Sequence, residues 1–109
     1  MAKATSNPAR ERIKPGFPAL YKYTNDIVFG DLWERPALSK RDRSLITVAA
    51  LVASYRPTQL KAHIRRALAN GVTKEEIAEV ITHLAFYAGW PAAMTGAHTA
   101  LDVYENPEE

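Results

Sequence analysis

Three side chains spaced four residues apart, Glu79, His83 and Tyr87, form the clearest candidate row for proton transfer in this chain of 109 residues. Residues four apart lie one above the other on a helix, so a carboxylate, an imidazole and a phenol would share one face. Glu79 would then orient His83 and favour its protonated form, as general acid–base chemistry requires. The alternative is an exposed Glu79–His83 pair with Tyr87 packed into the core.

His63 is a second candidate, beside the apolar position Ile64 in another segment. A single histidine there is compatible with simple packing, but convergence with His83 would create an acid–base pair or a pair of metal ligands. The separations among His63, His83 and His98 match no standard zinc spacing, and the chain has no cysteine. We therefore expect no metal.

Arg41 and Arg43 precede a long apolar run, where they would oppose the dipole of the helix that the run predicts. Arg43 is placed to hold a carboxylate, either that of a substrate or that of Asp42 or Glu79. The alternative is an exposed arginine in the first turn of the helix. Trp90 follows the row on Glu79, His83 and Tyr87 and completes the candidate residues.

Apolar residues recur at helical spacing in five stretches, and no stretch of useful length alternates with the two-residue period of a strand. The predicted helices cover about residues 17–30, 39–53, 57–69, 73–88 and 91–104. Thr24 interrupts the apolar stripe of the first. The second is apolar on most of its circumference, so it must be central or shared with another subunit. The fold class is therefore all-α.

Local signals define several helix ends. Ser39 and Asp42 form a capping arrangement before the second helix, and Thr73 and Glu76 form a capping box before the fourth. Gly71 has the residue type that ends a helix in the left-handed conformation. These signals position the candidate side chains on separate helices.

Residues 1–16 are polar and are broken by two prolines and a glycine, so we expect a flexible basic arm followed by one helical domain over residues 17–109. The chain carries 14 Lys and Arg against 12 Asp and Glu. A basic arm, together with Lys61, Arg65 and Arg66, could touch phosphates, but such arms are more often solvated tails, and we expect no nucleic-acid partner.

Composition excludes further classes of function. The lack of cysteine rules out disulfides, thiolate metal sites and thiol redox chemistry. No apolar run approaches the roughly 20 residues that span a bilayer, and the first residues lead into no apolar signal core. We expect no membrane partner and a cytoplasmic location. Burial in a chain of this size is modest, which favours assembly with copies of itself.

Three motifs in order resemble the carboxymuconolactone decarboxylase family over about residues 29–104: His63-x3-Ala67-Leu68-x-Asn70-Gly71, Glu75-Glu76-Ile77 and Tyr87-Ala88-Gly89-Trp90-Pro91. The resemblance implies the all-helical fold shared with alkylhydroperoxidase D and assembly into trimers or hexamers with pockets near subunit contacts. The peroxidase branch carries two cysteines where this chain has Arg56 and Gln59. A thiol peroxidase activity is therefore not expected.

The activity that this resemblance implies is decarboxylation of a carboxylated lactone, γ-carboxymuconolactone or a related small molecule, without a cofactor. Under that interpretation His63 or His83 donates a proton and Glu79 orients it. Arg43 binds the carboxylate or the developing oxyanion, while Tyr87 and Trp90 form the pocket wall. The alternative is a helical oligomer of the same family that binds a small ligand or has no catalytic activity.

Overall fold

A computed structural model describes residues 8–107, and all of the regular secondary structure over that range is helical. The helices are α1 (Pro8–Ile13), α2 (Pro18–Tyr23), the π-helix η1 (Thr24–Phe29), the 3₁₀ turn η2 (Leu32–Glu34), α3 (Lys40–Ala53), α4 (Pro57–Ala69), α5 (Lys74–Tyr87) and α6 (Trp90–Glu105). The all-α prediction is confirmed, and the four predicted helices after residue 38 match α3 to α6 within a few residues. No helix in the described part of the chain is long and apolar enough to cross a membrane.

The chain divides into two compact units, with the boundary between residues 39 and 40. This division does not coincide with the predicted boundary between residues 16 and 17. Residues 8–13 of the predicted arm form α1, while residues 1–7 lie outside the described range. Within the first unit, the Arg10 side chain is buried, donates to Asn25 Oδ1 at 2.8 Å and lies 4.3 Å from the ring centroid of Phe29. These contacts hold α1 in place.

The predicted first helix, residues 17–30, is present as two consecutive segments, α2 and the π-helix η1. The change occurs at Thr24, the polar residue that interrupts the apolar stripe. Its hydroxyl donates to the Leu20 carbonyl at 2.8 Å, a local bond that competes for a helix acceptor. Gly30 ends η1, where an added Cβ would lie 2.6 Å from the Asp26 carbonyl oxygen, so no larger residue fits without movement.

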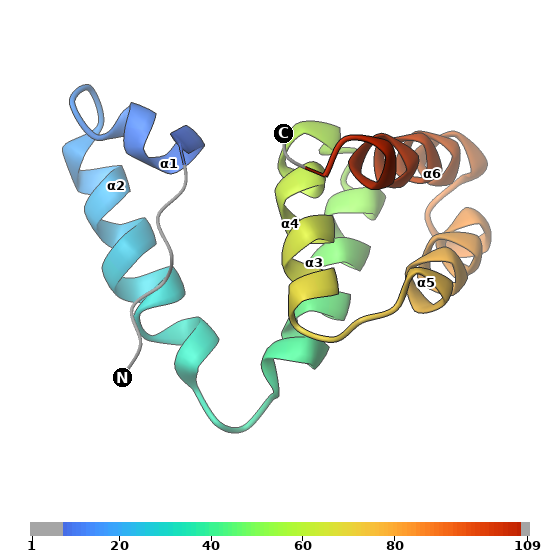
Figure 1. Ribbon diagram of the computed structural model, residues 1–109, viewed down its shortest axis with the longest axis horizontal. Helices are drawn as coiled ribbons and strands as arrows, with labels where there is room; N and C mark the ends of the chain where they lie inside the picture. The colour runs from blue at the N-terminus through green and yellow to red at the C-terminus, as the bar shows by residue number, and fades with distance from the viewer. Residues whose placement is uncertain (1–7, 108–109) are drawn as a thin grey trace. The chain divides into compact units, whose positions relative to one another are not determined.

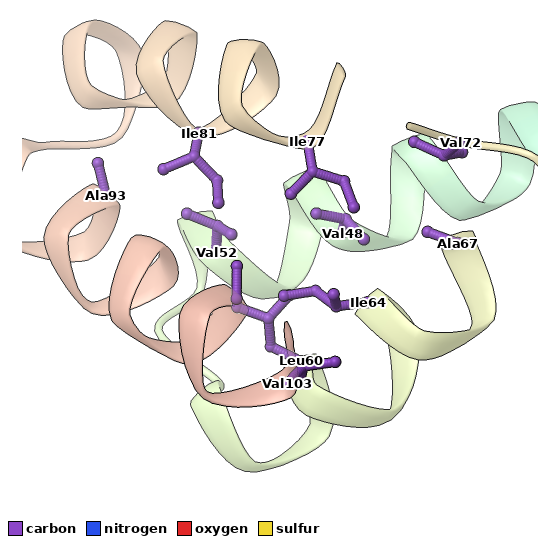
Figure 2. Close-up of a cluster of buried hydrophobic side chains, with 11 residues drawn as sticks. Val48, Val52, Leu60, Ile64, Ala67, Val72, Ile77, Ile81, Ala93 and Val103 are labelled. Atoms are coloured by element: carbon purple, nitrogen blue, oxygen red, sulfur yellow. The ribbon is translucent and has the colours of Figure 1, made fainter. Parts of the chain in front are cut away.

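The second unit is a bundle in which α3 packs against α4, α5 and α6 (Figure 1). Figure 2 shows Ile77 and Ile81 of α5 directed toward Val48 and Val52 of α3. Ile64 of α4 is fully buried in the same cluster. The sequence left two alternatives for this apolar helix, a central position or one shared with another subunit, and within the second unit α3 occupies the central position.

Capping and pairing fix the start of α5. Thr73 and Glu76 make the predicted capping box: the Thr73 hydroxyl accepts from the Glu76 amide at 3.0 Å, and Glu76 Oε1 accepts from the Thr73 amide at 2.9 Å. The Arg41 guanidinium also pairs with Glu76. The Thr73 amide and Arg41 together lower the pKa of the Glu76 carboxyl from its usual value. Glu76 therefore links α3 to α5.

Two turns flank α4 and share one hydrogen-bond pattern. After α3, the amides of Tyr55 and Arg56 bond back to the carbonyls of Val52 and Leu51 at 3.1 and 2.9 Å. After α4, the amides of Gly71 and Val72 bond back to Leu68 and Ala67 at 3.2 and 2.9 Å. Both are Schellman motifs, in which one residue adopts positive φ. That residue is Tyr55 (φ 59°) in the first turn and Gly71 (φ 95°) in the second.

Candidate functional site

The row predicted on the fourth helix lies on α5. His83 and Tyr87 are in ring contact, with centroids 4.6 Å apart and planes tilted by 48°. Glu79 and His83 are exposed, and within residues 8–107 no hydrogen bond or ion pair joins them. Tyr87 is 74% exposed, so it does not pack into the core as the alternative interpretation required. The row therefore presents an imidazole and a phenol to the surface.

Trp90 comes after this row in the sequence and is the first residue of α6. The backbone turns between the end of α5 and Trp90. Gly89 has φ 109°, a conformation that favours glycine, and it caps the start of α6. Trp90 then makes an edge-to-face contact with Phe86, with centroids 5.6 Å apart and planes at 81°. We call His83, Phe86, Tyr87 and Trp90 the aromatic cluster.

The aromatic cluster is unusually exposed for such large side chains, since Phe86 is 77% and Trp90 58% accessible. Phe86 was absent from the predicted site, although it stands four residues before Trp90 in the sequence. The position of Phe86 relative to the other residues of its helix indicated neither a buried side chain nor a catalytic role. The structure shows that it supports the indole of Trp90 by an edge contact.

His63 occupies a different environment, half-buried on α4. Burial, with a smaller contribution from the nearby Arg66 charge, lowers the pKa of His63 from 6.5 to about 4. Burial disfavours the charged imidazolium, and a positive neighbour disfavours it further. His63 is therefore neutral at pH 7, which makes it a poor proton donor and a better hydrogen-bonding or packing group.

Arg43 lies in the first turn of α3, where it is half-buried, and its carbonyl accepts the Thr47 hydroxyl at 2.7 Å. Its neighbour Arg41 makes the ion pair with Glu76 and lies 3.7 Å from Asp42. Asp42, suggested as a partner for Arg43, is thus a neighbour of Arg41.

Of the six predicted site residues, His83 and Tyr87 are in ring contact near the end of α5, and Trp90 begins α6 in contact with Phe86. Glu79 lies one turn earlier on α5, while His63 and Arg43 come from α4 and α3. Both α4 and α5 pack on α3 and α6. In the part of the chain that the structure describes, no group of three or more His, Cys, Asp or Glu side chains could hold a metal ion.

A shallow hollow, partly open to solvent, lies in the second unit where the end of α3, the start of α4 and α6 meet. None of the six predicted site residues lines it. Tyr55, Arg56 and Thr95 supply its polar lining. Sequence analysis missed this feature, because a hollow depends on how three helices meet and leaves no periodic signal.

Comparison with known proteins agrees with the architecture. Residues 18–102 match the model of the carboxymuconolactone decarboxylase family. The chain is 39% identical over 84 residues to a 4-carboxymuconolactone decarboxylase of Acinetobacter baylyi, which covers 77% of this chain and 63% of that protein. It is 38% identical over 66 residues to a nitrosuccinic acid decarboxylase of Metarhizium robertsii, which covers 61% of this chain and 46% of that protein.

A third relative is an uncharacterised 15.0 kDa protein of Paracoccus denitrificans, 33% identical over 103 residues, which covers 93% of this chain and 75% of that protein. The alignments to the two named decarboxylases span less than two thirds of their lengths. The family match covers most of the chain, including the central helix α3, the aromatic cluster and most of α6. On this evidence the chain belongs to the carboxymuconolactone decarboxylase family.

Proposed function

We propose that this protein removes a carboxyl group from a small acid whose carboxylate is next to an electron-accepting group, with γ-carboxymuconolactone as the first candidate. The support is that two relatives are named as decarboxylases, one of a carboxymuconolactone and one of nitrosuccinic acid. An unsaturated lactone and a nitro group can each accept the electron pair that a departing carboxylate leaves behind. The observation that carries the proposal for this chain is the exposed aromatic cluster with His83 in it.

The reaction proposed for the lactone balances without a cofactor. The bond between the γ-carbon and the carboxylate breaks, and CO₂ leaves. The bonding pair spreads into the unsaturated lactone as a dienolate, with negative charge on the carbonyl oxygen of the lactone. A proton is then added to carbon, so the net change is loss of CO₂ and gain of one proton. The protein needs a proton donor, a group that stabilises the oxyanion and an apolar wall.

The environments of the two histidines favour His83 as the proton donor. His63 is held neutral at pH 7, since its pKa is lowered to about 4. His83 is exposed and contacts the Tyr87 ring. Glu79, one turn before His83, would orient the imidazole once substrate is bound, because catalytic hydrogen bonds often tighten only in the complex. Tyr87 and Trp90 would form the wall, and Arg43 would hold the carboxylate or oxyanion.

We further propose that a second copy of the chain covers the aromatic cluster, in a trimer or hexamer. Trp90, Met94 and Leu101 lie on one stripe of α6 and are 58%, 49% and 49% exposed. Contiguous exposed apolar surface on a small protein marks an interaction site. Covering it would exclude water from His83, which strengthens electrostatic interactions there. Dissociation of the assembly on Met94→Lys, measured by light scattering, is the expected result.

A small-ligand-binding oligomer without catalysis remains the second candidate. The observation that favours it is that Glu79 and His83 are not bonded to each other in residues 8–107. Without that bond, the imidazole lacks the orienting partner that general acid–base catalysis usually employs. Turnover separates the two candidates.

The test is incubation of the purified protein with γ-carboxymuconolactone, and separately with nitrosuccinic acid, in the presence of a metal chelator. NMR follows loss of the substrate and appearance of its decarboxylated product. We expect His83→Gln to lower the rate about 100-fold or more. His98→Gln, which changes an exposed histidine of α6, is the matched control and should leave the rate unchanged.

Two outcomes would contradict the proposal. Absence of turnover with both acids by a folded protein would favour the ligand-binding candidate. Turnover that persists in His83→Gln but disappears in His63→Gln would reverse the assignment of the proton donor.

A further inference from the structure

Helix α6 carries two apolar stripes, and only one of them lies in the core. The buried residues of the inner stripe, two of which are labelled in Figure 2, are Ala93, Gly96, Ala100 and Val103. We call the second one the outer stripe, and its members are Trp90, Met94, Ala97 and Leu101. The three large side chains of the outer stripe are exposed. Because a helix that is apolar on two sides needs a neighbour on each, the outer stripe is suited to a further helix.

The outer stripe has the spacing of a coiled-coil seam. Its members follow one another at intervals of four, three and four residues. An alternation of three and four keeps side chains directed toward one neighbouring helix along their whole length. The inner stripe, which does face neighbouring helices, repeats at intervals of three, four and three residues. The shape that fits the outer stripe is therefore another helix that lies along α6.

The outer stripe is also symmetric about its own midpoint, which lies between Ala97 and His98. Met94 and Leu101 are equally far from this midpoint, and both are large and apolar. In a two-fold contact each surface meets a copy of itself, so Met94 of one copy would face Leu101 of the other. The small Ala97 side chain at the centre would allow the two helices to approach closely. This symmetry favours a second copy of α6 as the occupant.

Charge sets the direction of the second helix. Residues 90–101 contain no Asp, Glu, Lys or Arg, whereas Asp102 and Glu105 are exposed in the last turns of α6. Two parallel copies would bring these acidic ends together, and like charges repel. In an antiparallel pair, the acidic end of each helix lies beside the amino-terminal end of the other, where the helix dipole favours negative charge. The charges therefore favour antiparallel helices.

The exposed area is large enough for a specific contact. Phe86 extends the outer stripe through its ring contact with Trp90. From their exposed fractions, Phe86, Trp90, Met94 and Leu101 together present on the order of 450 Å². Two copies would bury about 900 Å² from these four side chains, and the remaining residues of the contact add to this. A specific protein–protein contact buries about 1,000 Å² or more.

We propose that α6 packs antiparallel against α6 of a second copy, about a two-fold axis that passes near Ala97. Met94 then lies against Leu101 of the partner subunit. Trp90 lies beside the partner's Glu105, which adds a carboxylate from the second copy to the aromatic cluster. The inference rests on the proposed covering of that cluster by a second copy, and it names the surface that does so. A two-fold contact occurs in a hexamer but not in a trimer, so this pairing selects the hexamer of the two expected assemblies.

Cross-linking of single-cysteine variants of the full chain tests the pairing, because the unchanged chain has no cysteine. In Ala97→Cys the two sulfurs would meet at the two-fold axis, where the helices are close enough for a disulfide. In Glu105→Cys they would be about 20 Å apart. We expect Ala97→Cys to form a linked dimer under mild oxidation at least tenfold faster than Glu105→Cys. Gln59→Cys, at an exposed position on α4, is the matched control and should be as slow as Glu105→Cys.

Light scattering measures a second consequence of the pairing. The unchanged protein should contain an even number of chains. Leu101→Lys should halve that number, because it places a charge inside the apolar contact. Gln59→Lys introduces the same charge outside the outer stripe and should leave the number unchanged. Circular dichroism reports whether each variant is folded.

Three outcomes would overturn the pairing. The first is an unchanged protein that is monomeric or contains an odd number of chains. The second is an Ala97→Cys variant that cross-links no faster than Gln59→Cys. The third is a Glu105→Cys variant that cross-links as fast as Ala97→Cys, which would indicate parallel helices.

Failure of the pairing can be told apart from failure of the proposed function. Dissociation by Met94→Lys without cross-linking of Ala97→Cys would keep a second copy on the aromatic cluster and reject α6 as the element that covers it. Cross-linking of Ala97→Cys in a protein that turns over neither acid would reject the proposed decarboxylation and leave the α6 pairing in place.

Discussion

The two turns on either side of α4 have the same hydrogen bonds but different residues at the strained position. The turn into α5 uses Gly71 at φ 95°, whereas the turn into α4 uses Tyr55 at φ 59°. Glycine adopts positive φ without steric strain, while tyrosine does not. An added Cβ at Gly71 would meet no atom within 4 Å, so space does not explain the difference. At Tyr55 the chain therefore accepts a backbone strain that it avoids at Gly71.

Replacing the glycine with tyrosine should give the largest effect. We expect Gly71→Tyr to lower the free energy of unfolding by about 2 kcal/mol, because φ 95° lies beyond the usual left-handed region for a side chain. Urea denaturation measures this. Gly16→Tyr, at a glycine with open space and no positive φ, is the control and should change stability little. Equal effects at both sites would remove the distinction between the turns.

The second prediction concerns His63, which lies on the helix that joins the two turns. Its folded pKa is about 4 against 6.5 in the unfolded chain. Between these values the unfolded state binds a proton that the folded state does not, so stability falls as pH falls from 6.5 toward 4. We expect a loss of about 1–2 kcal/mol, less than the full shift corresponds to, because solvent screens a half-buried imidazole.

Urea denaturation at several pH values measures the His63 contribution. His63→Gln should flatten the dependence between pH 6.5 and 4, and the exposed His98→Gln should preserve it. If the free energy of unfolding of His63→Gln keeps the same pH dependence, the His63 imidazole does not cause that dependence. The free energies of unfolding of variants in the two turns should therefore be compared at neutral pH, above the range in which His63 makes stability depend on pH.

The smallest effect should come from relieving the strain in the first turn. We expect Tyr55→Gly to raise the free energy of unfolding by about 1 kcal/mol, since the gain in the turn exceeds the extra entropy that glycine adds to the unfolded chain. Tyr55→Phe, which keeps the φ requirement, should stay within 0.5 kcal/mol of the unchanged protein. Loss of stability in Tyr55→Gly would show that ring contacts outweigh strain.

Features encoded within a few residues could be predicted from the sequence. The capping box of Thr73 and Glu76 and the glycine at the end of α4 depend on neighbours three to five residues away, and the structure confirms both. The apolar circumference of α3 predicted either a central position or one shared with another subunit, and in the second unit α3 is central. The turn at Tyr55 was not predicted, because tyrosine carries no signal for positive φ.

Features that depend on distant contacts could not be predicted. Helix α1 is held by Arg10 through Asn25, fifteen residues away, and its own six residues carry only a weak helical pattern. The exposure of Tyr87 depends on which helices pack beside α5, and spacing gives only the face that it shares with His83. Of the candidate site, sequence spacing predicted that His83 and Tyr87 share a face of α5, where their rings are in contact, but not the edge contact of Phe86 with Trp90.

Gly96 affects both the spacing between α3 and α6 and the shape of the hollow between them. A Cβ at this position would lie 3.2 and 3.3 Å from the two methyl groups of Val52, so the missing side chain permits the close approach of α3 and α6. The same glycine lines the hollow. A single added methyl group would both fill part of the hollow and press the two helices apart. The shape of the hollow and the spacing of α3 and α6 therefore cannot change independently, and a larger residue at position 96 requires compensation at Val52.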